Sequence, residues 1–119
     1  MNRILKACVN TWNGLRFVMQ SEEAFRQELA VLLVALPAAF LIAVEPWKRF
    51  LLIAVLLIVM IVELLNTSIE KLADHVTPRR NVRIKNVKDM GSAAVGFSIV
   101  LAGIAWLLAI GEWVAAFVM

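Results

Sequence analysis

The sequence predicts an all-α integral membrane protein, with three transmembrane helices and an amphipathic surface helix at the amino terminus. Hydrophobic residues make up 62% of the 119 residues and charged residues only 18%, against about 45–50% and about 25% in soluble domains. A soluble domain of this length buries only about two thirds of its unfolded surface, so it could not hide so many apolar side chains from water. The hydrophobic content excludes a disordered chain, and the single cysteine excludes a disulfide scaffold. We expect one domain over residues 1–119.

Long apolar stretches set the expected membrane spans. A bilayer core about 30 Å thick needs about 20 helical residues. The apolar stretches reach that length as spans over residues 24–46, 49–70 and 89–111, with extensions beyond them. The second stretch does so only if Glu63 belongs to it, so this span carries a carboxylate at or just inside the membrane boundary. A short turn around Pro46 is expected to join the first two spans.

The first twenty residues predict a different kind of element. Polar and basic residues, among them Arg3, Lys6, Asn10 and Asn13, recur at spacings of three and four, and apolar residues fill the opposite side. This pattern is typical of an amphipathic helix that lies in the headgroup plane, here residues 1–20. Ser21 is expected to cap the helix that follows, because a serine oxygen can accept hydrogen bonds from free amides at a helix start. A secretory signal is not expected, since no apolar run follows the first basic residues.

The distribution of positive charge predicts the orientation in the membrane. Ten of the twelve Lys and Arg residues lie near the start of the first span or between the second and third spans. Because positive residues collect on the cytoplasmic side, the amino terminus is expected inside and the carboxyl terminus outside. The net charge is +3, and the basic residues are expected to contact anionic headgroups or phosphates. We expect no nucleic-acid partner, because the basic loop has no interleaved aromatic residues and no nucleic-acid-binding module occurs.

Acidic side chains gather where each predicted span meets the cytoplasmic boundary. Glu63, Asn66 and Glu70 are spaced at three and four, so they share one helical face at the end of the second span. Further acids stand at the starts of the first and third spans, at Glu22, Glu23, Glu28 and Asp89. Charged groups at a membrane boundary are costly, so each is expected to have a partner or a function.

Two interpretations of these acids are open on the residues alone. In the structural interpretation they form hydrogen bonds or ion pairs between helices, and Glu22 interacts favourably with the helix dipole at the start of the first span. In the functional one they bind magnesium and supply a general base, because carboxylate oxygens suit hard cations. A basic neighbour such as Lys88 then favours phosphoryl transfer. The motifs of P-loop proteins and protein kinases are absent from the sequence, and the lone His75 has no companion for a zinc site.

Three segments resemble the small bacterial membrane diacylglycerol kinases in order and spacing, and the resemblance covers nearly the whole chain. They are residues 22–28 (EEAFRQE), 63–70 (ELLNTSIE) and 88–94 (KDMGSAA). The resemblance implies a homotrimer in the bacterial inner membrane, with active sites shared between neighbouring subunits. It also implies an ATP-dependent kinase that moves the γ-phosphate of magnesium ATP to the hydroxyl of 1,2-diacylglycerol, giving phosphatidate. Mg²⁺ is the implied cofactor, and the implied partners are diacylglycerol, ATP and membrane lipids.

The resemblance assigns roles to individual residues. It implies that Glu63 is the catalytic base and that Glu22 and Glu70 are the magnesium ligands. The implied nucleotide contacts are Arg3, Asn10, Glu22, Glu70, Arg79, Arg80, Asn81, Lys88 and Asp89. The implied contacts of the lipid substrate are Trp12, Arg16, Glu28, Glu63, Asn66 and Ser92. The sequence departs from well-known relatives at Asn10, where they have an aromatic residue, and in the more basic loop over residues 78–83.

Two rival functions remain. The first is phosphorylation of undecaprenol by the same fold, since both lipids present a primary hydroxyl at the interface. The second is a non-catalytic membrane subunit whose acids only pack helices. The presence of acids at all three span entrances disfavours the second rival, and phosphate transfer tested on both lipids would decide the first.

Overall fold

Four helices account for nearly all of the described chain. The structure, a computed structural model, describes residues 2–77 and 81–119. The helices are α1 (Arg3–Ser21), α2 (Glu23–Ile42), α3 (Pro46–Val76) and α4 (Val82–Val118). The described ranges contain no strand. The predicted all-α class is therefore confirmed.

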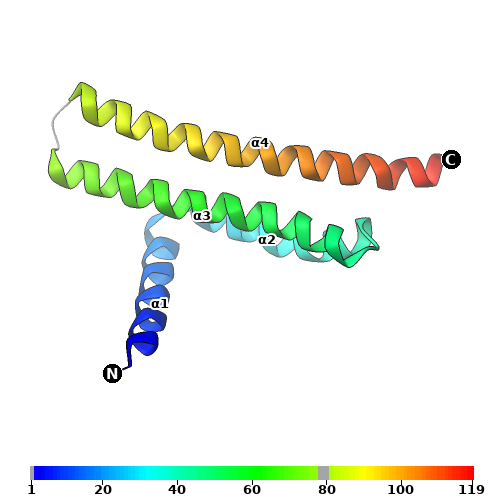
Figure 1. The fold of residues 1–119 in the computed structure, drawn as a ribbon, viewed down its shortest axis with the longest axis horizontal. Helices are drawn as coiled ribbons and strands as arrows, with labels where there is room; N and C mark the ends of the chain where they lie inside the picture. The colour runs from blue at the N-terminus through cyan, green and yellow to red at the C-terminus, as the bar shows by residue number, and fades with distance from the viewer. Residues whose placement is uncertain (1, 78–80) are drawn as a thin grey trace.

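Three of the helices form a bundle in which α3 packs against both α2 and α4 (Figure 1). Each of the three is long and apolar enough to cross a membrane, as expected. The remaining helix, α1, leaves the bundle at a steep angle, and the amino terminus lies away from the other helices. Val18 is the buried residue of α1, and it packs with Phe25 of α2 and Met60 of α3. This small apolar cluster fixes the base of α1 against the bundle.

The helix ends differ from the expected spans for local reasons. α2 stops at Ile42 and an extended Ala43 follows, while Pro46 occupies the first turn of α3. Proline disfavours a helical residue before it and is preorganised for a helix start, so the break falls there. At the other end α4 begins at Val82, seven residues before the expected span. The Asn81 side chain accepts hydrogen bonds from the first amides of α4 and so caps this polar extension.

The junction between α1 and α2 corrects one prediction. Ser21 does not cap α2, because it is the last residue of α1 and Glu22 occupies the N-cap position without a side-chain cap bond. Instead, the Arg26 guanidinium donates hydrogen bonds to the carbonyl oxygens of Met19 and Gln20, at 2.8 and 3.2 Å. These bonds satisfy carbonyls that a helix end leaves free, which favours the extension of α1 through Ser21.

Several small residues are buried inside the bundle. Ala39 of α2, Gly91 and Ala102 of α4 are all buried, and small side chains allow helices in lipid to approach closely. The Trp106 indole of α4 donates a hydrogen bond to the Leu52 carbonyl of α3 at 3.0 Å. Many large apolar side chains on α2 and α4 are exposed instead. An outer surface of this kind suits contact with acyl chains.

Candidate active site

The centre of the candidate site is one face of α3. Asn66 is buried, with 7% of its surface exposed, while Glu63 and Glu70 on either side of it are half-buried. The Asn66 amide nitrogen Nδ2 donates a hydrogen bond to Glu70 Oε1 at 3.1 Å. This geometry is consistent with the expectation that the three residues share one face of the helix. The amide orients one carboxylate and leaves the other, Glu63, free of that bond.

Two further acids lie near this face: Glu22 at the α1–α2 junction and Glu28 in α2. The negative charge of Glu63 is repelled by both Glu70 and Glu22, and that of Glu28 by Glu63. One carboxylate oxygen of Glu28, Oε1, is buried without a hydrogen-bond partner. The bundle therefore brings four acids from different parts of the sequence within electrostatic reach of one another. Such a concentration of negative charge is costly and is relieved by a cation or a proton.

The first turns of α4 contribute charged groups to the same end of the bundle. Lys88 forms an ion pair with Asp74 of α3, and Lys85 pairs with Asp89 at 2.6 Å. All four side chains are at least partly exposed to solvent. Lys88 therefore links α4 to the polar end of α3, and its ammonium group is accessible to an anionic ligand that competes with Asp74.

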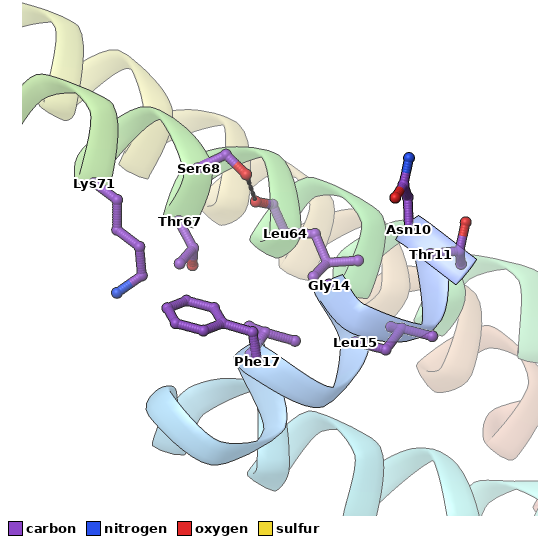
Figure 2. Close-up of a pocket in the computed structure, with 10 residues that line it drawn as sticks. Asn10, Thr11, Gly14, Leu15, Phe17, Leu64, Thr67, Ser68 and Lys71 are labelled. Carbon is purple, nitrogen blue, oxygen red and sulfur yellow. Dashed lines mark hydrogen bonds between the residues drawn. The ribbon is translucent and has the colours of Figure 1, made fainter. Parts of the chain in front are cut away.

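A groove of about 320 Å³ lies between α1 and α3 (Figure 2). Asn10 and Thr11 of α1 line it together with Thr67 and Lys71 of α3. Figure 2 shows Lys71 reaching toward the ring of Phe17, and its Nζ lies 5.3 Å from the ring centroid. A cation at this distance over an aromatic face is attracted to it. The groove thus joins α1 to the helix that carries the acids.

The structure brings some of the expected site residues together and leaves others apart. It gathers Glu22, Glu28, Glu63, Asn66 and Glu70, and it places Asn10 beside α3. Other expected residues are exposed in the single chain, namely Arg3, Trp12 and Arg16 on α1 and Ser92 on α4. Asn81 is used as the cap of α4. Arg79 and Arg80 lie outside the described residues.

Sequence reasoning missed three residues that the fold brings to this end of the bundle. Lys71 follows Glu70 directly and Asp74 follows it by one turn, so continuing the helical spacing past residue 70 would have found both. Gly91 belongs to the segment 88–94 but gave no sign of its contact. A methyl group at Gly91 would lie only 2.1 Å from the Asn66 oxygen Oδ1. A contact between helices of this kind leaves no mark in the periodicity of either one.

The acids are a suitable but incomplete metal site. Among the residues that the structure describes, no three His, Cys, Asp or Glu side chains lie close enough to hold a metal ion by themselves. Magnesium is usually bound by one or two carboxylates together with substrate phosphates and water. Glu22 and Glu70, both near Glu63, supply hard oxygen donors of that type. The residues therefore fit a magnesium ion that arrives with a phosphate ligand.

Comparison with known proteins identifies similar chains. Residues 9–110 match the family described as prokaryotic diacylglycerol kinase. The chain is 42% identical over 106 residues to a diacylglycerol kinase of Escherichia coli strain K12, covering 89% of this chain and 87% of that protein. It is 41% identical over 106 residues to a diacylglycerol kinase of Pseudomonas aeruginosa, covering 89% and 86%. A diacylglycerol kinase of Helicobacter pylori is 32% identical over 104 residues, covering 87% and 81%.

Proposed function

The chain belongs to the prokaryotic diacylglycerol kinase family, and on that premise we propose that it transfers the γ-phosphate of magnesium ATP to the hydroxyl of 1,2-diacylglycerol. The products are ADP and phosphatidate. As a member of this family the chain is a bacterial membrane enzyme, a kinase with transmembrane helices. The observation that carries the proposal is the acidic face of α3, where Asn66 holds Glu70 next to Glu63. This face lies toward the polar end of a helix long enough to cross a membrane.

Glu63 is the proposed general base. Its carboxylate takes the proton of the lipid hydroxyl as the oxygen attacks the γ-phosphorus, and the bond between that phosphorus and the β–γ bridging oxygen breaks. A lipid hydroxyl is a weak nucleophile, so a positioned base contributes about 10²–10⁴-fold to the rate. The half-buried position of Glu63 on an apolar helix supports this role, because a membrane-embedded hydroxyl can reach it.

Glu22 and Glu70 would hold the magnesium ion. When bound, the ion supplies positive charge that stabilises the transferring phosphoryl group. The hydrogen bond from Asn66 keeps the Glu70 carboxylate oriented, and the N-cap position of Glu22 places its carboxylate at the α1–α2 junction. Both acids are close enough to Glu63 to repel its charge. A cation between them and the phosphates would offset this repulsion.

The nucleotide and lipid contacts are proposed from the same end of the bundle. Lys88 releases its ion pair with Asp74 and binds a phosphate oxygen of the nucleotide instead. Asn10 contacts the nucleotide from the groove between α1 and α3. Glu28 and Asn66 border the lipid headgroup. The exposed residues Arg3, Trp12 and Arg16 on α1 and Ser92 on α4 act across subunit boundaries of a homotrimer. Their exposure in the single chain supports shared active sites.

The proposed orientation places this end of the bundle at the cytoplasmic surface, where ATP is available. The amino terminus is inside, the carboxyl terminus is outside, and α1 lies in the headgroup plane. The steep angle between α1 and the bundle supports that placement (Figure 1). So does the concentration of basic residues near the polar ends of α3 and α4.

The test is phosphate transfer by the purified full chain in lipid-containing micelles. ATP labelled in the γ-position is supplied with magnesium and with either diacylglycerol or undecaprenol, and a matched reaction contains a chelator. We expect labelled phosphatidate that disappears with the chelator. Faster labelling of undecaprenol would reassign the lipid. Failure to label either lipid, with the protein folded, would favour a non-catalytic subunit.

A further inference from the structure

A glycine on α4 makes an unusually close approach to the acidic face of α3. A Cβ atom at Gly91 would lie 2.1 Å from Asn66 Oδ1 and 3.2 Å from Asn66 Cγ. Even the short C–H···O contacts between packed helices have carbon–oxygen distances of about 3.3–3.6 Å. The Asn66 amide therefore occupies the space that any larger residue at position 91 would need.

This approach is particular to Gly91. The same helix contains Gly96 and Gly103, and a Cβ atom at either of them would meet nothing within 4 Å. Gly91 is buried, whereas Gly96 and Gly103 are exposed. The requirement for glycine on α4 therefore comes from the Asn66 side chain and not from helix packing in general.

The contact fixes the direction of the amide. Asn66 Oδ1 is buried without a hydrogen-bond partner, while Nδ2 on the other side of the same planar group donates to Glu70. Turning the amide away from Gly91 would move the donor away from that carboxylate. We propose that Gly91 is a positioning residue: its missing side chain admits the Asn66 oxygen against α4 and so directs the amide nitrogen to Glu70.

The consequence for the enzyme rests on the proposed function of Glu70 as a magnesium ligand. A methyl group at position 91 forces Asn66 to another rotamer, and Glu70 loses its hydrogen bond. Gly91→Ala should then lower turnover about 10- to 100-fold, the cost of misplacing a catalytic group by about 1 Å. It should also raise the magnesium concentration needed for half-maximal activity. A loss of folded enzyme alone would lower the rate but would not change this concentration. Gly96→Ala is the matched control and should behave as the wild type.

A double-mutant cycle separates this mechanism from general disruption. Asn66→Ala removes the amide but keeps its Cβ atom, which lies 3.9 Å from the Cβ position of residue 91, an ordinary contact. We expect Gly91→Ala to lower the midpoint of thermal unfolding when Asn66 is present and to leave it unchanged in the Asn66→Ala background. Such non-additivity is the signature of two residues in contact.

The outcomes are distinct. An unchanged magnesium requirement in Gly91→Ala, or thermal effects that add in the double variant, would overturn the role of Gly91. If the wild type itself transfers no phosphate to lipid, the proposed function fails. The thermal cycle needs no substrate, so it would still decide whether Gly91 and Asn66 are coupled.

Discussion

The amide nitrogen of Asn66 lies 3.1 Å from Glu70 Oε1, one helical turn further along α3. A single amide cannot satisfy both carboxylate oxygens, so Glu70 keeps acceptor capacity for another ligand. The geometry differs from that of an ordinary ion pair, because the neutral donor orients the acid without cancelling its charge. The neighbouring acids Glu22 and Glu63 add to the negative charge of this region. Together these features favour the binding of a divalent cation at this face.

A first prediction follows for the metal ligands. Glu22→Gln and Glu70→Gln replace a charged oxygen donor by a neutral one, and magnesium depends on that charge. Each variant should need more magnesium for half-maximal activity and should turn over more slowly, with the fold intact by circular dichroism.

The matched control is Glu23→Gln. Glu23 is adjacent to Glu22 but exposed, and its Oε1 accepts a 3.4 Å hydrogen bond from Gln27. This variant should keep the magnesium dependence of the wild type. If the Glu22 and Glu70 variants also keep it, those acids have only capping and packing roles.

Much of the fold and of the acidic face follows from single-helix patterns. The three apolar stretches have the length that a bilayer demands, and the described part of the chain contains three helices able to span one. The spacing of Glu63, Asn66 and Glu70 places them on one face whatever the rest of the chain does. Local physics is sufficient here, because hydrophobic length and helical periodicity do not depend on the neighbouring helices.

The remaining features depend on contacts between elements. Ser21 has the composition of an N-cap, yet Arg26 binds the last carbonyls of α1 and the helix continues through Ser21. The proximity of Gly91 to Asn66 and the ion pair of Lys88 with Asp74 require the rotation and register of α4 against α3. Residues 90–111 of α4 carry no charged side chain on any side, so the sequence of this helix does not specify which side meets α3.

A second prediction separates the two roles open to Lys88. If it binds the nucleotide, Lys88→Met should raise the KM for ATP and lower turnover. Asp74→Asn removes the other half of the ion pair and should leave the KM for ATP near that of the wild type. Because both groups are partly exposed, breaking the pair should cost only about 0–1 kcal/mol of unfolding free energy. Equal effects of the two variants on the KM would make the pair structural.

The third prediction concerns topology. Because ten of the twelve basic residues lie within residues 3–26 or within residues 71–88, these regions should be cytoplasmic. A reporter fused after Met119 should therefore report an external location, and one inserted between Thr77 and Asn81 a cytoplasmic one. The reverse result would place the acidic face on the side of the membrane without ATP and would contradict the proposed site.

The last prediction distinguishes catalysis from packing at Glu63. Glu63→Gln keeps the size and hydrogen-bonding reach of the side chain but removes its basicity. If Glu63 is the base, turnover should fall by about 10²–10⁴-fold, while equilibrium dialysis with labelled ATP shows nucleotide binding close to that of the wild type.

In the competing interpretation, Glu63 is a hydrogen-bond partner between helices, which glutamine can replace. That variant would then keep its activity, and it would also gain thermal stability, because the repulsion from Glu22 and Glu70 is relieved. A gain in stability is expected in either case, so turnover is the deciding measurement. Retention of more than about a tenth of wild-type turnover, well short of the usual contribution of a general base, would exclude Glu63 from that role.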